Sequence, residues 1–156
     1  IDWHWTHIGG GALNDQLRAR AEAHGISARI TWRGACDQPE VIAAMRAADL
    51  FVLPSRVAQD GDRDGLPNVL MEAASQCLPI LSTPVSAIPE FIDTGVHGIL
   101  CADDPTTLAN EMTRLAETPD LGPKLATAAH ARLHSEFTMQ PGIDHLATRL
   151  RALLTT

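Results

Sequence analysis

The residues best suited to chemistry lie in one stretch, DGDRDGLPNVLMEAASQ. Pro67 has a preset φ and can open a helix, which leaves the N–H groups of residues 68–70 unpaired at the positive end of the helix dipole. Such N–H groups bind phosphate, and Gly65 has no side chain to keep a ligand away from the backbone. Because carboxylates repel phosphate, Asp64 and Glu72 are better explained as acceptors for hydroxyl groups. The stretch therefore predicts a site for a diphosphate with a hydroxylated group at each end.

A simpler interpretation of the same acids stays open. Acidic residues before a helix are common, so Asp62 and Asp64 could do no more than favour a helix start. Glu72 could then be a solvated helix residue. Its sequence neighbours are apolar, however, and leave no obvious exposed helix face around it.

Segments typical of strands and of helices alternate along the chain, with short connections. Apolar, β-branched and aromatic residues predict strands at 3–8, 28–34, 50–55, 78–83 and 97–102. The intervening patterns predict helices at 9–25 after a glycine-rich turn, 39–49, 67–76, 86–95 as a short helix or turn, 104–117, 122–137 and 141–154. This alternation predicts a single α/β domain, a Rossmann-like doubly wound parallel sheet. Ligands of such sheets bind at the carboxyl ends of the strands, where the loops 9–12, 33–40 and 54–68 are expected.

Composition narrows the classes of protein. A chain of 156 residues fits one domain, and its net charge of −7 argues against a nucleic-acid-binding surface. The three cysteines form no CxxC pair, which favours reduced thiols, a cytosolic setting and no structural zinc. No apolar run approaches the roughly 18 residues of a membrane helix, and the start has no signal-peptide pattern. Since the chain also starts without Met, we expect a piece of a longer protein.

Two histidines suggest a metal site. His130 and His134 are four residues apart on an expected helix, which places them on one face. No third ligand has suitable spacing, so a surface or half-buried pair is favoured and no metal is expected.

The run LPS…DGLPNVLMEAASQCLPILSTPVSAIPEFIDTGVHGIL resembles the donor-binding half of retaining GT-B glycosyltransferases, the group 1 family that uses nucleotide sugars. That family carries a Glu-x7-Glu motif, with Gly and Pro after the first acid and a small-residue helix after the second. Asp64 and Glu72 match the two acids. The resemblance continues upstream through IGGGALNDQLRARAEAHG and PEVIAAMRAADLFVLPS, so it covers nearly the whole chain and implies the C-terminal half of a GT-B fold. The loop SRVAQDGDRDGLP is most similar to members that build bacterial exopolysaccharide.

The resemblance also implies roles for individual residues. Asp64 would hold hydroxyl groups of the donor sugar, and Glu72 would accept from the ribose hydroxyls. The other implied donor-binding positions are Gly9, Gly10 and Gly11 in the glycine-rich turn, Arg33, Gly34 and Ala35 beside the nucleobase, Gly65, Leu66, Pro67, Asn68, Val69 and Leu70 along the sugar and diphosphate, and Thr83 at the next strand end.

Two departures from the family pattern bear on activity. The first acid is Asp64 instead of Glu, one methylene shorter, and Asp62 as a substitute has the wrong spacing to Glu72. The basic Arg/Lys pair that neutralises the diphosphate in the family comes from a segment upstream of Ile1. Arg56 and Arg33 are the nearest local cations; either could replace the pair in donor binding, and both could equally be solvated loop residues.

We therefore expect residues 1–156 to be a nucleotide-sugar-binding domain that is truncated on its N-terminal side and lacks the acceptor-binding domain. The intact enzyme would transfer a sugar from a nucleotide-diphosphate donor to an acceptor hydroxyl with retained configuration, in exopolysaccharide or other cell-surface glycan synthesis. The isolated chain is expected to bind the donor weakly and to transfer nothing. We expect no cofactor, and we expect the nucleotide sugar and the missing acceptor domain as partners. The expected location is cytoplasmic, with peripheral contact to the inner membrane face open through the missing domain.

Other classes of protein fit the sequence less well. A nucleotide-sugar 2-epimerase shares the two-lobed architecture, and a non-catalytic nucleotide-sugar-binding module would explain an Asp at the first acid position. A dinucleotide dehydrogenase is the weakest alternative, because GGGALN is not a GxGxxG turn.

Overall fold

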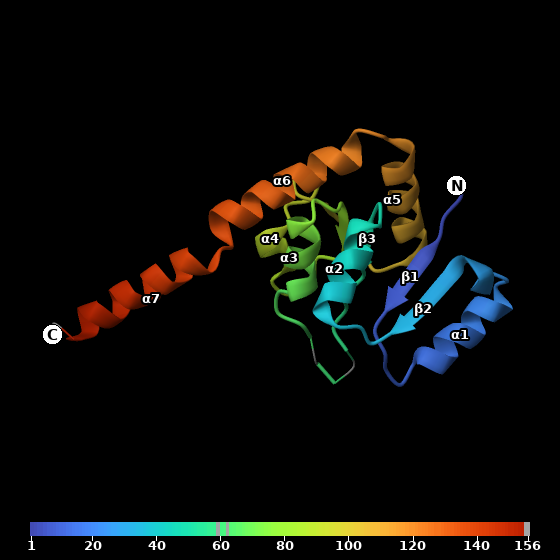
Figure 1. The fold of residues 1–156 in the computed structure, drawn as a ribbon, viewed down its shortest axis with the longest axis horizontal. Coiled ribbons are helices and arrows are strands. Elements are labelled where there is room, and N and C mark those ends of the chain that lie inside the picture. Colours follow the sequence, from blue (N-terminus) through green and yellow to red (C-terminus); the bar gives the residue numbers. More distant parts are fainter. Residues whose placement is uncertain (59, 62, 155–156) are drawn as a thin grey trace. The chain divides into compact units, whose positions relative to one another are not determined.

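The computed structural model describes residues 1–58, 60–61 and 63–154, and the chain forms two compact units, Ile1–Ala48 and Asp49–Thr156 (Figure 1). Each unit contains its own parallel sheet, with two strands in the first and three in the second. The α/β fold with parallel strands is thereby confirmed. That the two units together make one donor-binding domain stays a prediction.

The first unit contains one pair of parallel strands and their connections. Its elements are β1 (Trp5–Ile8), α1 (Asn14–Ala23), the 3₁₀ helix η1 (Ser27–Arg29), β2 (Ile30–Gly34) and α2 (Gln38–Arg46). The register runs from Trp5 opposite Ile30 to Ile8 opposite Gly34, so both strands end at the same edge. A capping box starts α2, in which Asp37 accepts from the Glu40 N–H and Glu40 accepts from the Asp37 N–H.

The second unit contains the sheet β3-β4-β5, in that order, and most of the helices. Its elements are β3 (Phe51–Leu53), α3 (Asn68–Ser75), β4 (Ile80–Ser82), α4 (Ile88–Phe91), β5 (Ile99–Leu100), α5 (Pro105–Glu117), α6 (Leu121–Glu136) and α7 (Met139–Leu154). The strands are shorter than the sequence predicts. The segment expected as a short helix or turn at 86–95 forms a four-residue helix followed by a bridge from Thr94 to Gly98.

The core of the second unit lies between its sheet and its last helices. All three residues of β4 are buried, as expected for a strand covered on both faces. Leu81 of β4, Ile99 of β5 and Leu125 of α6 form one buried cluster. Partly buried residues from the neighbouring strands, loops and helices pack against it: Leu50, Val52, Cys101, Leu108, Met112, Leu115 and Leu121.

The C-terminal end of α3 is fixed by a Schellman turn. The Cys77 N–H donates to the Ala74 carbonyl at 3.0 Å, and the Leu78 N–H donates to the Ala73 carbonyl at 3.1 Å. Cys77 has a φ of 52°, the left-handed conformation that glycine adopts most easily. The helix packs against α6, where Nδ1 of His130 lies 3.1 Å from the Ala74 carbonyl. The packing of α3 against α6 therefore anchors the helix whose other end begins the candidate site.

The last helix, α7, exposes large apolar side chains at Met139, Ile143, Leu146, Leu150 and Leu153. They recur every three or four residues, so they share one helix face.

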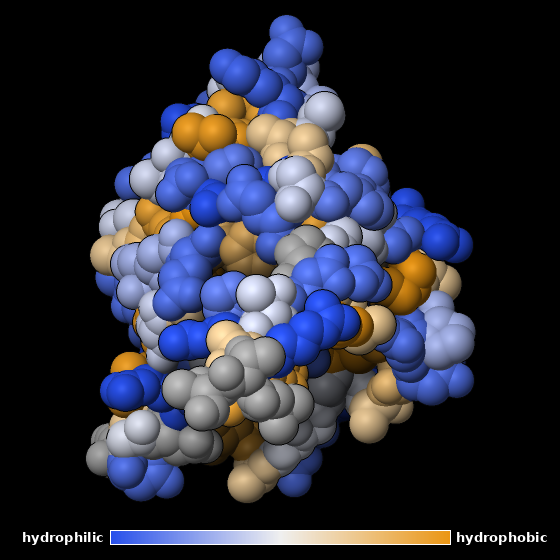
Figure 2. Space-filling view, turned by 90° about the vertical axis from the view of Figure 1, so that its left-hand side faces the viewer, coloured by the Kyte–Doolittle hydropathy of each residue, from blue (hydrophilic) through white to orange (hydrophobic). Residues whose placement is uncertain are grey.

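Figure 2 shows a face on which hydrophilic residues predominate and apolar residues occur in small separate groups. In the part of the chain that the structure describes, no helix is long and apolar enough to span a lipid bilayer.

Candidate functional site

Two side-chain hydroxyls connect the carboxyl ends of β3 and β4. Ser82 Oγ donates to the Leu53 carbonyl at 2.6 Å, and Thr83 Oγ1 donates to the Ser55 carbonyl at 2.5 Å. Both residues are fully buried. The hydroxyl of Thr83, which the sequence places in the donor site, thus holds two loops in place, and its direct contact with a ligand stays a prediction.

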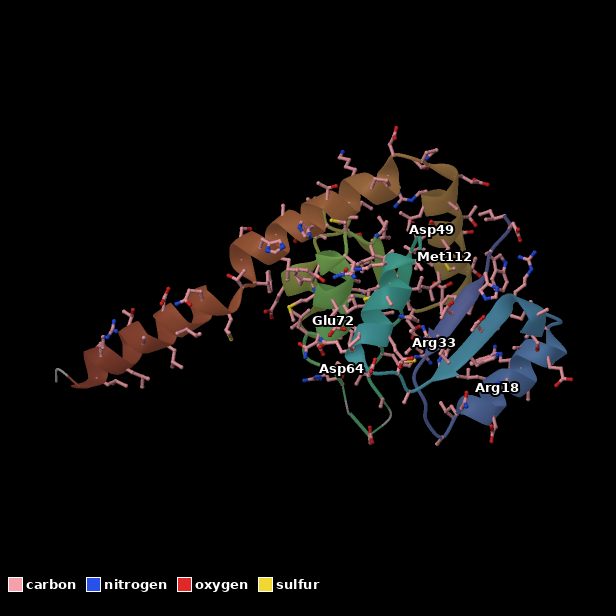
Figure 3. All side chains as sticks on the ribbon, viewed as in Figure 1. Arg18, Arg33, Asp49, Asp64, Glu72 and Met112 are labelled. Atoms are coloured by element: carbon pink, nitrogen blue, oxygen red, sulfur yellow. The ribbon has the colours of Figure 1, made fainter. Side chains whose placement is uncertain are left out.

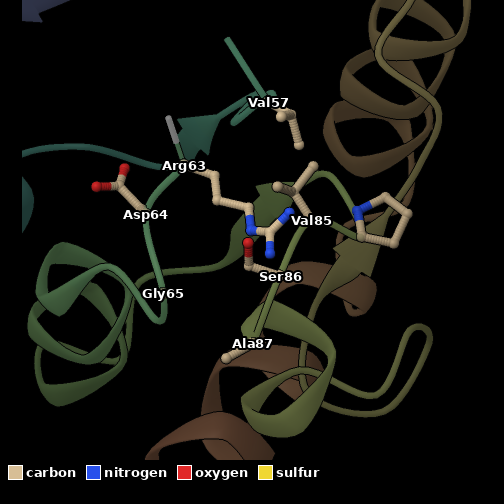
Figure 4. A pocket seen from close by; sticks show the side chains of 8 residues that line it. Val57, Arg63, Asp64, Gly65, Val85, Ser86 and Ala87 are labelled. Atoms are coloured by element: carbon tan, nitrogen blue, oxygen red, sulfur yellow. The ribbon is translucent and has the colours of Figure 1, made fainter. Parts of the chain in front are cut away.

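A pocket lies between these two loops (Figure 4). One wall is the end of the loop after β3, and the other is the segment after β4; the Ala87 N–H donates to the Gly65 carbonyl at 3.3 Å and joins them. The cavity has a volume of about 450 Å³. Its lining residues are Val57, Arg63, Asp64, Gly65, Pro84, Val85, Ser86 and Ala87. Of the residues that the sequence assigns to the donor site, Asp64 and Gly65 are thus brought together here.

Arg63 and Asp64 are neighbours in the first wall, have opposite charges and point in different directions. In Figure 4 the Arg63 side chain runs across the pocket toward Ser86, whereas the Asp64 carboxylate points away from it. Both side chains are exposed. A ligand in this pocket therefore meets the cation of Arg63, while the Asp64 carboxylate is directed elsewhere.

The N-terminal end of α3 follows directly. Pro67 is its N-cap, with φ −62° and ψ 124°. The Leu70 N–H donates to the Pro67 carbonyl at 3.1 Å, so the expectation of three unpaired N–H groups is wrong for Leu70: a 3₁₀-type bond tightens the first turn. Within residues 1–58, 60–61 and 63–154, the N–H groups of Asn68 and Val69 have no protein acceptor. Two donors thus remain for an anion.

The two acids lie on either side of this helix start (Figure 3). Asp64 precedes α3, and Glu72 is half-buried in its second turn. No described side chain caps the helix, so Asp64 is not a capping residue, and the partial burial of Glu72 argues against a simple solvated position. Asp62, the other acid of the loop, lies outside the described residues.

The remaining expected site residues belong to the first unit. The Gly9 N–H donates to the Gly34 carbonyl at 2.7 Å, which joins the glycine-rich turn after β1 to the turn after β2. Gly9 and Gly34 have φ values of 129° and 68°, which only glycine adopts without strain. Gly10, Gly11 and Ala35 are exposed at the same edge. Each unit therefore assembles its own group of expected site residues.

The histidine pair packs within the second unit. The rings of His130 and His134 meet edge to face, with centroids 4.5 Å apart, and His130 also contacts the α3 backbone. In the described residues, no three His, Cys, Asp or Glu side chains are grouped closely enough to hold a metal ion. The pair therefore fits a packing role.

The chain matches a known protein family over most of its length. The model of the family "Glycosyl transferases group 1" matches residues 1–118. The chain belongs to this family. The Asp64-to-Glu72 segment, the pocket beside Asp64 and the start of α3 all lie within the matched residues.

Two relatives of this group 1 glycosyltransferase chain are named for polysaccharide synthesis. The amylovoran biosynthesis glycosyltransferase AmsK of Erwinia amylovora is 35% identical over 151 residues, which is 96% of this chain and 37% of that protein. WcaL of Escherichia coli K12, named for colanic acid biosynthesis, is 32% identical over 156 residues, 98% of this chain and 38% of that protein. This chain thus spans less than two fifths of the length of either relative.

Two solved structures share the fold of this chain. HepE of Anabaena, solved with UDP, matches with a TM-score of 0.82 and 20% identity, over 96% of this chain and 41% of that one. The C-terminal domain of LpcC, a group 1 family protein of Francisella tularensis, matches with a TM-score of 0.72 and 21% identity, over 88% of this chain and 71% of that one. The likeness establishes that this group 1 chain has the fold of GT-B glycosyltransferases.

Two cations that the sequence assigns to the donor site have acidic partners, and their contact with a ligand stays a prediction. Arg56 pairs with Asp103 at 3.1 Å, and Arg33 pairs with Glu40 at 3.3 Å, so both expected candidates already have acidic partners. Arg63, which sequence reasoning passes over, lines the pocket instead. Its position directly before Asp64 is the only sequence signal that could have pointed to it.

Proposed function

We propose that this chain is the donor-binding part of a retaining glycosyltransferase that uses a nucleotide-diphosphate sugar in exopolysaccharide or other cell-surface glycan synthesis. The observation that carries the proposal is the pocket lined by Asp64 and Gly65, in a chain of the group 1 family in which two available N–H groups follow within four residues, at the start of α3. The names of AmsK and WcaL support polysaccharide synthesis, and the presence of UDP in the HepE structure supports a nucleotide donor.

The residues suggest how the donor would be bound and activated. Charge builds up on the diphosphate as its bond to the sugar breaks, and the N–H groups of Asn68 and Val69 would stabilise that charge. A hydrogen bond to a charged group contributes about 1.5–3 kcal/mol, so two such bonds assist departure without requiring a metal. Asp64 would accept from sugar hydroxyls, and Glu72 from the ribose.

The acceptor half of the reaction lies outside this chain in the proposal. The relatives are more than twice as long as the part that this chain matches, which leaves room for an acceptor-binding domain. The isolated chain would then bind the donor and transfer nothing. The names of the relatives favour transfer over the epimerase alternative, since both are named as glycan biosynthesis proteins.

The test is a titration of the chain with UDP, GDP and ADP, followed by amide NMR shifts. We expect one nucleotide to shift the amides of residues 65–72, and Glu72→Gln to weaken its binding. Glu117→Gln is the matched control, because it removes the same charge from an exposed position on α5. If no nucleotide moves these amides at millimolar concentration, or if both variants bind equally well, the proposed donor site is wrong.

Two further measurements separate the finer statements. NMR analysis of the product anomer formed by the full-length enzyme tests retention, and an inverted product would exclude it. Asp64→Glu in the full-length enzyme distinguishes a working variant from a non-catalytic module. A working Asp64 site should already transfer sugar before the change, whereas transfer that appears only with Glu would identify a degenerate site.

A further inference from the structure

We propose that Arg63 binds an oxyanion of the donor in the pocket between residues 63–65 and 84–87. The assignment rests on the proposed donor-binding function and adds a specificity-determining residue to it. The oxyanion has two chemical sources, a phosphate of the diphosphate and a carboxylate on the donor sugar. Both match the planar, bidentate guanidinium.

The positive charge of Arg63 is available to a ligand. Among the described residues it has no ion-pair partner, although it lines the pocket. Arg56 is held by Asp103, and Arg33 by Glu40. The chain has a net charge of −7, so an anion bound here needs a local cation to offset the overall repulsion.

The side chain of Arg63 is directed over the pocket. Figure 4 shows the guanidinium of Arg63 over the pocket, beside Ser86, with the Asp64 carboxylate directed away. An oxyanion that meets Arg63 therefore approaches from the side opposite to the carboxylate that would repel it. Asp64 stays free to accept from hydroxyl groups of the same ligand.

The backbone on the opposite side of the pocket from Arg63 is fixed by hydrogen bonds. The segment after β4 is held by the Thr83 hydroxyl, by a 2.9 Å bond from the Val85 N–H to the Thr83 carbonyl and by the bond from Ala87 to Gly65. Ser86 has a φ of 50°, a left-handed conformation that is costly for a serine and that these surrounding bonds impose. Arg63 thus faces a fixed wall, which lets one side chain select the ligand group between them.

The test compares Arg63→Gln with Arg149→Gln. The second variant is the matched control, since it removes the same charge from an exposed position on α7. Calorimetric titrations of the 156-residue chain use UDP, GDP, UDP-glucose and UDP-glucuronate. Because Arg63 is exposed, we expect Arg63→Gln to weaken binding about three- to tenfold, with a smaller difference in high salt. Arg63→Lys should lie between, since it keeps the charge and loses the bidentate geometry.

The titrations of the Arg63 variants distinguish the two sources of the oxyanion. Weaker binding of UDP or GDP by Arg63→Gln alone identifies a phosphate as the oxyanion. Unchanged binding of UDP and GDP with a lost preference for UDP-glucuronate over UDP-glucose identifies a sugar carboxylate. If Arg63→Gln and Arg149→Gln behave alike toward all four probes, Arg63 has no such role while the donor site stands. If the unmodified chain binds none of the probes, the proposed function fails and the role of Arg63 fails with it.

Discussion

The Schellman turn that ends α3 contains a residue that glycine would suit better. Cys77 is exposed, so its side chain adds little packing. Its φ of 52° is a left-handed conformation that the turn requires and that is strained for a residue with a Cβ. That conformation costs about 1–2 kcal/mol for a residue other than glycine. Glycine loses about 0.5–1 kcal/mol more on folding because its unfolded chain is freer. We therefore expect Cys77→Gly to raise the free energy of unfolding by about 0.5–1 kcal/mol.

Urea and thermal unfolding followed by circular dichroism measure this change. For a domain of this size the melting temperature should rise by about 1–4 °C. Cys77→Ala is the control, because it removes the same thiol and keeps the Cβ in the left-handed conformation. Equal stabilisation by both variants would show that the thiol, and not the backbone, was the cause. A lower stability of Cys77→Gly would refute the argument from backbone strain.

Two other predictions concern the second unit. A Cβ on Gly98 would lie 2.9 Å from the Ile80 carbonyl oxygen and 3.1 Å from Cγ2 of Ile92, so Gly98→Ala should lower the free energy of unfolding by about 2–3 kcal/mol in urea titrations. Gly142→Ala, where a Cβ meets no atom within 4 Å, is the control and should not destabilise; equal effects would contradict the predicted close contact. Hydrogen bonds from the Thr107 side chain and from its N–H lower the pKa of Asp104 below its usual 3.8. The lowered pKa means that the charged form stabilises the fold above about pH 4 and that this contribution is lost as the pH falls through the folded-state pKa. Asp104→Asn should therefore be less stable than the unmodified chain at pH 7 and equally stable well below pH 3.8, and a difference that does not depend on pH would contradict the role of the charge.

The sequence predicts the order of the elements well, because that order depends on local patterns. The alternation of buried strands with helices places α1, α2, α3, α5 and α6 within a few residues of their expected positions. The ends differ for identifiable reasons: the Asp37 capping box starts α2 one residue before the expected range, and β3 is shorter than the apolar run that predicts it. The division into two units, with a sheet in each, has no counterpart in these local patterns.

The candidate site is predicted less completely, because it depends on contacts between loops. The Asp64-to-Glu72 spacing and Pro67 indicate the helix start and the two acids. The sequence does not indicate that Thr83 is buried against the Ser55 carbonyl, or that the Leu70 N–H is used within the first turn. The position of Arg63 over the pocket likewise depends on the direction of its side chain.

The opposite directions of Arg63 and Asp64 have a consequence for how such loops diverge. Because the two side chains are directed differently, exchange of either residue changes the charge on one side of the loop and leaves that of the other side. The charge that faces the pocket and the charge that is directed away from it can therefore change independently, although the two residues are neighbours in the sequence.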